Sequence, residues 1–431
     1  MSTVVKSETA PPADAVAVRS WKLPIVLGVL ALFAVLVFIV LGPSGTATFR
    51  ISQENDAWQV PNLVLPAKGV GVVVAIVCVA MAYLSWQQTK ARGKSAKWVV
   101  MTFTVVFVVG LIVWIIGGTT TQNITLVGLF TGAMLITTPL VFGSLSGVLS
   151  ERAGVVNIAI EGQLLAGAFT AALVSSITNS AYAGLLAAAV AGVLVSSLLA
   201  LFSIKYLVNQ IIVGVVLNVL VSGLTGFLFE KIMKTKVAGE TIYNQPTQLP
   251  NLPIPLLSEI PILGPTLFRQ SIVGYFMLVL VVVLWFGLFR TRWGLRVRAV
   301  GEHPKAADTV GINVNRTRVL NVLAGGAVAG IGGAYFTLVA VSSFSKDMTG
   351  GLGFIALAAL IFGRWNPIGA ALAALLFGVA GNLQSILSLA GTPIDGQFLA
   401  MLPYALTILA VSGFVGKAMS PAASGEPYVK G

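Results

Sequence analysis

Long apolar runs separated by short polar segments recur along the whole of this 431-residue chain. A helix rises about 1.5 Å per residue, so about 20 apolar residues cross a hydrocarbon core about 30 Å thick. Runs of that order lie at residues 23–42, 69–86, 98–117, 124–142, 157–178, 182–204, 207–229, 271–289, 318–341, 368–388 and 399–416. Together with a shorter run at 353–363, they predict an all-α polytopic membrane protein with about 10 to 12 transmembrane helices.

The run at 353–363 is too short to cross a bilayer by itself. Glycine-rich residues come directly before it, and Pro367 follows in the sequence GRWNP. We therefore expect a broken or half-membrane helix here. In the turn after it, we expect Arg364 on the cytoplasmic side and Trp365 at the level of the lipid head groups.

Composition supports a membrane protein, because 57% of the residues are hydrophobic and only 9% are charged, against roughly 25% in soluble domains. The net charge of +12 does not indicate a nucleic acid partner, since the basic residues cluster between apolar runs, where the positive-inside rule places them. One cysteine, Cys78, and one histidine, His303, provide neither a disulfide framework nor a metal site. We expect contact with membrane lipid, and no cofactor or metal.

The distribution of lysine and arginine predicts the orientation. Basic residues concentrate in the N-terminal tail, in 87–97 and in 290–318, and helix parity puts all three on one side, which is then the cytoplasm. The proline-rich segment 230–270 falls outside, and its prolines exclude a spanning helix. The expected division is a disordered cytoplasmic tail at 1–20, additional transmembrane helices at 21–120, a core at 121–417 with the cytoplasmic loop 290–317, and a C-terminal tail at 418–431.

The loop between the runs 271–289 and 318–341 contains a pattern typical of a short helix. In EHPKAADTV, Pro304 suits a first helical position, and Gly311 follows as the stop. Such a helix, with glycines on both sides, could fit into a groove on another protein. A solvated basic loop that only fixes topology explains the same residues equally well.

Three motifs carry a resemblance to a known family. They are SERAGVVNIAIEG at 150–162, AVGEHPKAADTVGINVNRTR at 299–318, and GFIALAALIFGRWNPIGAALAALLFG from Gly353 to Gly378. In this order they resemble the permease subunits of bacterial ABC importers of the branched-chain amino acid and simple-sugar class, and most closely those of nucleoside uptake. The resemblance covers roughly residues 124–416 and leaves the first 120 residues outside.

The resemblance implies a type II importer-like permease in the cell membrane of a bacterium. Such a subunit pairs with a second permease, here expected to be a distinct homologue, receives cargo from an extracytoplasmic substrate-binding lipoprotein, and is driven by a cytoplasmic ABC ATPase. The helix at 302–312 would lie in a cleft of that ATPase. The residues to which this coupling role is assigned are Gly301, Glu302, Pro304, Ala306, Ala307, Gly311 and Ile312.

The sequence agrees with ATP hydrolysis on a separate chain. A phosphate-binding loop needs the pattern G-x-x-x-x-G-K-[ST]. The sequence GKS occurs at Gly93, but Gln88 occupies the position of the first glycine.

Several polar residues lie inside the apolar runs and are candidates either for the translocation path or for buried polar packing. An ionised carboxylate near the bilayer centre costs on the order of 3 kcal/mol, so Glu161 is expected to face protein or water. At the start of a helix, nearby amide N–H groups would offset much of that cost. The candidates are Asn157, Glu161, Gln163, Asn218 and Asn382.

Two further features concern the ends and faces of the expected helices. Glu151 and Arg152 are placed in a turn on the cytoplasmic side. In LAGGAVAGIGGAYF, Gly326 lies four residues before Gly330 and Ala329 lies four residues before Gly333. This spacing indicates close packing between helices, since small residues let backbones approach in lipid.

The most direct functional hypothesis is the permease of an ATP-driven importer for nucleosides or a related small sugar-containing solute. A secondary transporter driven by an ion gradient is the alternative, because broken helices and an intramembrane carboxylate also occur there. A membrane-embedded enzyme is not supported, since no cluster of acid, base and nucleophile is found.

Overall fold

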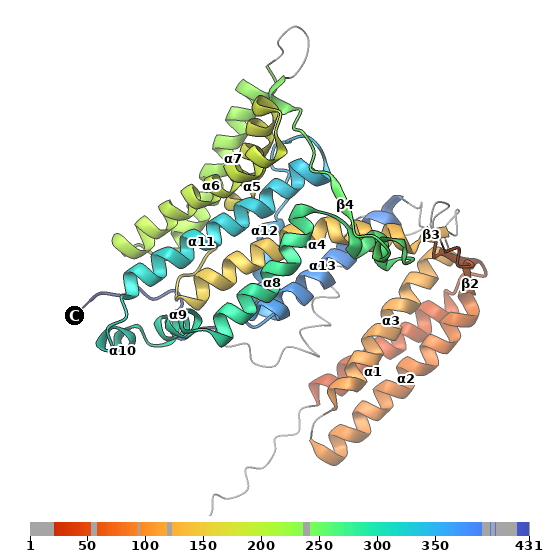
Figure 1. Ribbon diagram of the computed structural model, residues 1–431. Coiled ribbons are helices and arrows are strands. Elements are labelled where there is room, and N and C mark those ends of the chain that lie inside the picture. The colour runs from red at the N-terminus through yellow and green to blue at the C-terminus, as the bar shows by residue number, and fades with distance from the viewer. Residues whose placement is uncertain are drawn as a thin grey trace, which may run out of the picture. The chain divides into compact units, whose positions relative to one another are not determined.

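The computed structural model describes residues 21–52, 58–93, 95–118, 123–235, 242–389, 397, 401 and 420–430. In this part of the chain, ten helices are long and apolar enough to cross a membrane, which confirms the all-α polytopic fold (Figure 1). The expected tail at 1–20 lies outside the described residues, as does most of the expected run at 399–416. The spans are Lys22–Val40, Ala67–Ala91, Trp98–Gly117, Leu126–Arg152, Ile160–Thr178, Ala181–Lys205, Gln210–Met233, Ile272–Arg290, Val314–Ala340 and Pro367–Leu389.

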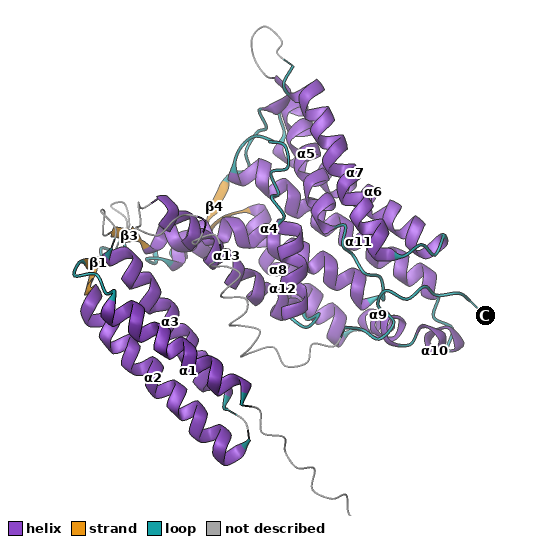
Figure 2. Ribbon diagram, turned by 180° about the vertical axis from the view of Figure 1, so that it is seen from behind, coloured by secondary structure: helices purple, strands orange, loops and turns teal. Residues whose placement is uncertain are grey.

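The secondary structure is helical except for short strands in the connections (Figure 2). The α-helices are α1 (Lys22–Val35), α2 (Ala67–Arg92), α3 (Lys97–Gly117), α4 (Leu126–Arg152), α5 (Ile160–Thr178), α6 (Ala181–Ala200), α7 (Gln210–Leu228), α8 (Ile272–Arg290), α9 (Arg292–Glu302), α10 (Pro304–Thr309), α11 (Val314–Tyr335), α12 (Leu352–Phe362) and α13 (Pro367–Leu389). Five-residue π-helical turns continue α1, α6, α7 and α11, at Leu36–Val40, Leu201–Lys205, Phe229–Met233 and Phe336–Ala340. The strands are β1 (Thr46–Arg50), β2 (Leu63–Pro66), β3 (Asn123–Thr125), β4 (Asn251–Pro253) and β5 (Arg269–Ser271).

The chain divides into two compact units, and the smaller one contains α1, α2 and α3. Its core consists of apolar side chains from all three helices, and Phe38 and Phe107 pack with their ring centroids 5.7 Å apart. Cys78 lies in this core with its side chain fully buried, as the apolar run around it indicates.

Helix α11 occupies the interior of the larger unit, where α4, α5 and α6 pack against it. Its glycines make this possible. A Cβ atom on Gly326 would clash with the side chain of Ser196, and one on Gly333 would clash with the backbone of Leu164. Gly330 lies equally close to the backbone of Ala188. The expected packing role of these small residues is confirmed.

Helix α12 has 11 residues and is therefore only about 16 Å long, roughly half the thickness of a hydrocarbon core. A short apolar helix is thus present where a broken or half-membrane helix was expected. It packs on α4, α5 and α13, and a turn at 363–366 connects it to α13.

The connections contain the strands. β1 pairs in parallel with β3, and Phe49 lies opposite Ile124 in the register. β4 pairs antiparallel with β5, and Leu252 lies opposite Gln270. Within the described residues 242–270, the proline-rich segment forms short turns and these strands rather than a spanning helix, as expected.

Candidate functional site

Glu161 lies in the first turn of α5, but the backbone amides that it binds belong to the N-terminal end of α12. Its Oε1 atom accepts hydrogen bonds from the Thr349 hydroxyl at 2.6 Å and from the Gly351 N–H at 2.8 Å. Its Oε2 atom accepts one from the Gly353 N–H at 2.6 Å. The N-terminus of a helix has unpaired N–H groups and a partial positive charge, so a carboxylate is a favourable cap there.

Gly353 is the residue that allows this contact. A Cβ atom on Gly353 would lie 2.5 Å from both the backbone N and the Cα of Glu161, closer than real Cβ contacts. The start of α12 therefore lies directly against the start of α5, and a larger residue at this position would push the two helices apart.

Asn218 of α7 binds the same end of α5. Its side-chain oxygen accepts a 2.8 Å hydrogen bond from the Gly162 N–H, and its amide donates one of 2.8 Å to the Ile158 carbonyl. Both polar atoms of the Asn218 amide are thus bonded, as an amide in an apolar run requires. Gly214, one turn earlier on α7, lies close to the backbone around Ile158.

Asn157 and Gln163 form a buried network with two serines that the sequence analysis did not identify. The Gln163 amide donates to Ser196 of α6 at 2.9 Å and to Asn157 at 3.2 Å. Ser146 of α4 donates to the Gln163 oxygen at 3.1 Å. All four side chains are fully buried, so the network joins α4, α5 and α6.

Asn382 lies apart from these residues. Its amide on α13 donates to the carbonyls of Leu129 at 2.7 Å and Gly128 at 3.3 Å, and so connects α13 to α4. The structure thus gathers four of the five candidates, Asn157, Glu161, Gln163 and Asn218, around the start of α5 and separates the fifth. Each bonds to a neighbouring helix or to the turn before α5.

At one end of the larger unit, α9 and α10 form a helical hairpin before α11 (Figure 1). Pro304 begins α10, and Gly311 ends it with a φ of 86°, in the left-handed region that favours glycine. The predicted short helix is therefore confirmed. Helix α9 was not predicted, although its Thr291 hydroxyl accepts a hydrogen bond from the Gly294 N–H, as an N-cap does.

The predicted coupling residues divide into exposed and buried groups. Ala307 is 3% exposed and packs with Val300, Val314 and Tyr428. Gly301 is buried because its Cα lies against the carbonyl of Arg152, with no room for a side chain. Pro304 and Ile312 are half-buried, and the exposed members of the set are Glu302, Ala306 and Gly311.

Residues 420–430, expected only as part of a C-terminal tail, bind across this hairpin. The Ala423 N–H donates to the Gly301 carbonyl at 2.9 Å, and the Ala422 N–H donates to the Glu302 carboxylate at 3.1 Å. Arg318 of α11, which is 1% exposed, donates to the Glu426 carbonyl at 2.9 Å. No periodic pattern marked this segment, because its contacts are mostly made by backbone atoms.

The turn between α12 and α13 binds the end of α4. Trp365 is 6% exposed, and its indole N–H donates a 2.5 Å hydrogen bond to Glu151. Arg152 donates to the Trp365 carbonyl at 2.9 Å. The indole of Trp365 thus binds a buried carboxylate within the protein, and its expected depth at the head groups stays a prediction. Glu151 and Arg152 lie in the last turn of α4 rather than in a loop, since α4 continues ten residues beyond the predicted end at 142.

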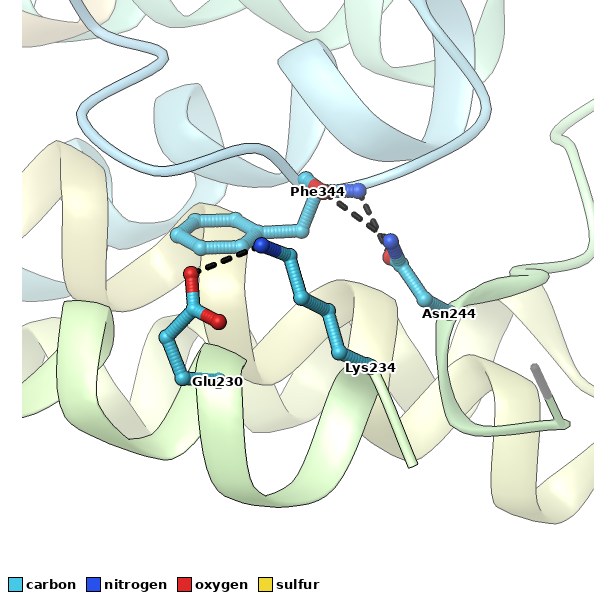
Figure 3. Close-up of polar contacts among 4 residues, drawn as sticks. All are labelled: Glu230, Lys234, Asn244 and Phe344. Atoms are coloured by element: carbon cyan, nitrogen blue, oxygen red, sulfur yellow. Dashed lines mark hydrogen bonds and ion pairs between the residues drawn. The ribbon is translucent and has the colours of Figure 1, made fainter. Parts of the chain in front are cut away.

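Near the C-terminal end of α7, hydrogen bonds join the loop that contains Phe344 to Asn244 (Figure 3). The Phe344 N–H donates to the Asn244 side-chain oxygen at 2.7 Å, and the Asn244 amide donates back to the Phe344 carbonyl at 3.0 Å. Phe344 packs edge-on against Phe169 at 5.3 Å, and Lys234 pairs with Glu230 at 2.8 Å. These contacts fix the start of the segment 242–270 to the loop that leads into α12.

The site offers hydrogen bonds, close packing and one capped half-helix. Among the described residues, no group of three or more His, Cys, Asp or Glu side chains is placed to hold a metal ion.

Comparisons with known proteins agree with this architecture. Residues 128–411 match the model of the family described as branched-chain amino acid transport system, permease component. The chain is 42% identical over 305 residues to the guanosine ABC transporter permease protein NupQ of Bacillus subtilis, which covers 68% of this chain and 93% of the relative. It is 39% identical over 310 residues to the nucleoside ABC transporter permease protein NupC of Lactococcus lactis subsp. cremoris, which covers 69% and 95%.

A more distant relative is the guanosine ABC transporter permease protein NupP of Bacillus subtilis, 27% identical over 252 residues, which cover 56% of this chain and 69% of the relative. No solved structure matches the chain. Because the family model covers more than half of its residues, the chain belongs to the family of permease components of branched-chain amino acid transport systems.

Proposed function

We propose that this chain is the permease subunit of an ATP-driven importer of nucleosides, in the cell membrane of a bacterium. The observation that carries the proposal is the 39% and 42% identity, over nearly the full length of the relatives, to a nucleoside and a guanosine permease. Neutral cargo of this kind needs hydrogen-bond partners and shape rather than a counter-charge.

The hairpin α9–α10 is the proposed docking element for an ATPase that hydrolyses ATP on a separate chain. Its tip presents Glu302, Ala306 and the 74% exposed Val310 to the outside. An exposed apolar side chain beside a carboxylate suits a groove with an apolar floor and a basic edge. The buried Ala307 and the glycines Gly301 and Gly311 give the hairpin its shape rather than its contacts.

Movement of the hairpin would reach the membrane helices through tight contacts. Gly301 lies against the carbonyl of Arg152 at the end of α4. Arg152 in turn binds the carbonyl of Trp365 between α12 and α13. Because the first contact leaves no space and the second is a hydrogen bond of 2.9 Å, displacement of α9 and α10 would shift α4 and the half-helix together.

The polar residues at the start of α5 are proposed to hold the half-helix in place beside the path. Glu161 accepts hydrogen bonds from the start of α12, and Asn218 accepts one from the start of α5. Asn157 and Gln163 are fully buried. The Asn382 side chain likewise hydrogen-bonds α13 to α4. Transport would then depend on these residues through the position of α12.

The comparisons and the charge pattern support the proposed partners and the proposed orientation. Two permeases of Bacillus subtilis with the same guanosine designation match this chain at 42% and 27% identity, which supports a distinct homologue as the second permease. Basic residues in 87–97 and 290–318 favour a cytoplasmic N-terminus. The segment 242–270 would then face an extracytoplasmic substrate-binding lipoprotein.

Uptake of labelled guanosine by cells with and without this gene tests the proposal. Unlabelled nucleosides should compete, whereas glucose and leucine should not. Depletion of ATP at a preserved ion gradient should stop uptake. Uptake that continues without ATP and stops when the gradient is collapsed would establish a secondary transporter instead.

A further inference from the structure

A cavity of about 980 Å³ lies between α9 and the first turns of α11. Residues 310–313 close one edge of it. Neither the family assignment nor the proposed transport path gives this cavity a role. Its most distinctive lining residues are Arg292, Trp293, Leu295, Arg296, Arg316 and Asn321.

Three guanidinium groups line the cavity without a partner of opposite charge. Arg292 and Arg296 are one turn apart on α9, and Arg316 lies across from them on α11. In the described part of the chain, none of the three forms a salt bridge, although all are exposed. Like charges gathered around one space repel each other, so an anion between them would be bound favourably.

The most buried polar side chain in the cavity lining, Asn321, has one atom without a partner. Asn321 is 2% exposed, and its amide donates to the Thr317 carbonyl at 2.8 Å. Its side-chain oxygen is buried and has no hydrogen-bond partner. A buried acceptor of this kind requires a donor, which a hydroxyl group on a ligand would provide.

The rim of the cavity is apolar. Trp293 is 43% exposed, Leu295 61% and Leu320 55%. The candidate spans that flank the hairpin end at Arg290 and begin at Val314, so this rim lies beside the ends of two candidate spans. Exposed aromatic and aliphatic side chains at that level contact acyl chains, while arginines reach the head groups.

We propose that this cavity binds the head group of an anionic phospholipid of the glycerol type, such as phosphatidylglycerol. The phosphodiester lies among Arg292, Arg296 and Arg316, a head-group hydroxyl donates to Asn321, and the acyl chains cover Trp293, Leu295 and Leu320. The assignment of this lipid to the cytoplasmic leaflet rests on the orientation in the proposed function. A bound lipid would connect α9 to α11 and so stiffen the base of the hairpin.

Native mass spectrometry of the purified complex, with added phosphatidylglycerol or phosphatidylcholine, tests the site without any measurement of transport. A failure here therefore leaves the transport proposal standing. The wild type should retain phosphatidylglycerol selectively. The triple variant R292Q/R296Q/R316Q should bind it on the order of 100-fold more weakly, and each single variant roughly fivefold more weakly.

The double variant R290Q/K205Q is the charge control, because both residues are exposed and neither lines this cavity. It should bind lipid like the wild type. An equal loss of lipid in this control would show that net charge alone explains binding, and it would overturn the proposal.

Asn321→Leu should reduce the preference for phosphatidylglycerol over phosphatidic acid, which lacks the head-group hydroxyls. Displacement of the lipid by soluble glycerol phosphate would indicate a site for a free anion. Loss of the ATPase subunit from the triple variant, with lipid binding unchanged, would identify the cavity as a protein interface.

Discussion

The Glu161 carboxylate and the Gly353 backbone N–H are joined by a 2.6 Å hydrogen bond that connects the start of α5 to the start of the half-helix α12. Two more donors, from Thr349 and Gly351, reach the same carboxylate. A helix that begins inside a membrane cannot leave its first amides to water, so these bonds supply what solvent would supply elsewhere. The position of α12 therefore depends on one acidic side chain.

Replacement of Glu161 should destabilise the larger unit. Glu161→Ala leaves the amides of Gly351 and Gly353 unbonded, and we expect a loss of about 3–5 kcal/mol in the free energy of unfolding. Glu161→Gln keeps one acceptor oxygen and should lose about 1–3 kcal/mol, with reduced uptake. Thermal unfolding in detergent measures the loss of stability in both variants.

Glu230→Gln, which removes an exposed ion pair, is the control and should change stability by less than about 1 kcal/mol. Wild-type stability and uptake in Glu161→Gln would show that the carboxylate is dispensable.

Gly353→Ala tests the same contact from the other helix. The added methyl group meets the backbone of Glu161, which cannot move aside as a side chain could. We expect a destabilisation of about 1–3 kcal/mol together with weaker transport. The matched control is Gly223→Ala on α7, where nothing lies within 4 Å of the new Cβ. That variant should be neutral or slightly stabilised, because alanine favours a helix. Equal behaviour of the two variants in thermal unfolding would argue against the tight contact.

Variants of two adjacent alanines on α10 should distinguish coupling to ATP hydrolysis from folding of the hairpin. Ala306 is exposed and Ala307 is 3% exposed. Ala306→Glu should leave the protein folded and assembled while uptake falls relative to ATP hydrolysis. Ala307→Glu places a carboxylate among Val300 and Val314 and should destabilise the hairpin by about 3 kcal/mol. Transport, ATPase activity and limited proteolysis of each variant distinguish the two outcomes. Wild-type coupling in Ala306→Glu would remove α10 from the proposed docking surface.

Local patterns in the sequence predicted the features that depend on few residues. Apolar run length indicated the spans, and the short run before GRWNP indicated α12. Pro304 and Gly311 marked the ends of α10, because φ restriction and a left-handed stop act within one turn. For Glu161 the sequence indicated that a carboxylate in this position needs amide donors, but the amides come from residues 190 positions later in the chain.

Contacts between distant residues were missed. Trp365 was expected at the level of the head groups because a tryptophan near a helix end usually lies there. The sequence did not indicate its hydrogen-bond partner, Glu151, which is 214 positions away. The end of α4 was placed too early because Ser150, Glu151 and Arg152 look like a polar loop. Their side chains are accommodated by tertiary contacts, which a single sequence does not reveal.

Residues 420–430 bind Gly301, Glu302 and Arg318. Their removal exposes Ala307 and Val300 and takes away the carbonyl that binds the buried Arg318. We expect the hairpin to become more mobile, because the segment bridges it to α11. Limited proteolysis should cut the deletion variant sooner within 302–313, and uptake should fall relative to ATP hydrolysis.

Point variants separate the packing of this segment from its length. Tyr428→Ala removes the aromatic ring that packs on Ala307 and Val314, and it should reproduce part of the deletion phenotype. Tyr428→Phe keeps that ring and loses only the hydroxyl, which interacts with Asp308 of α10, so it should show a smaller change than Tyr428→Ala in the proteolysis and coupling measurements. Val429→Ala is a further control, because that side chain is 65% exposed. If the deletion variant matches the wild type in uptake per ATP hydrolysed and in resistance to protease, the segment contacts the hairpin without stabilising it.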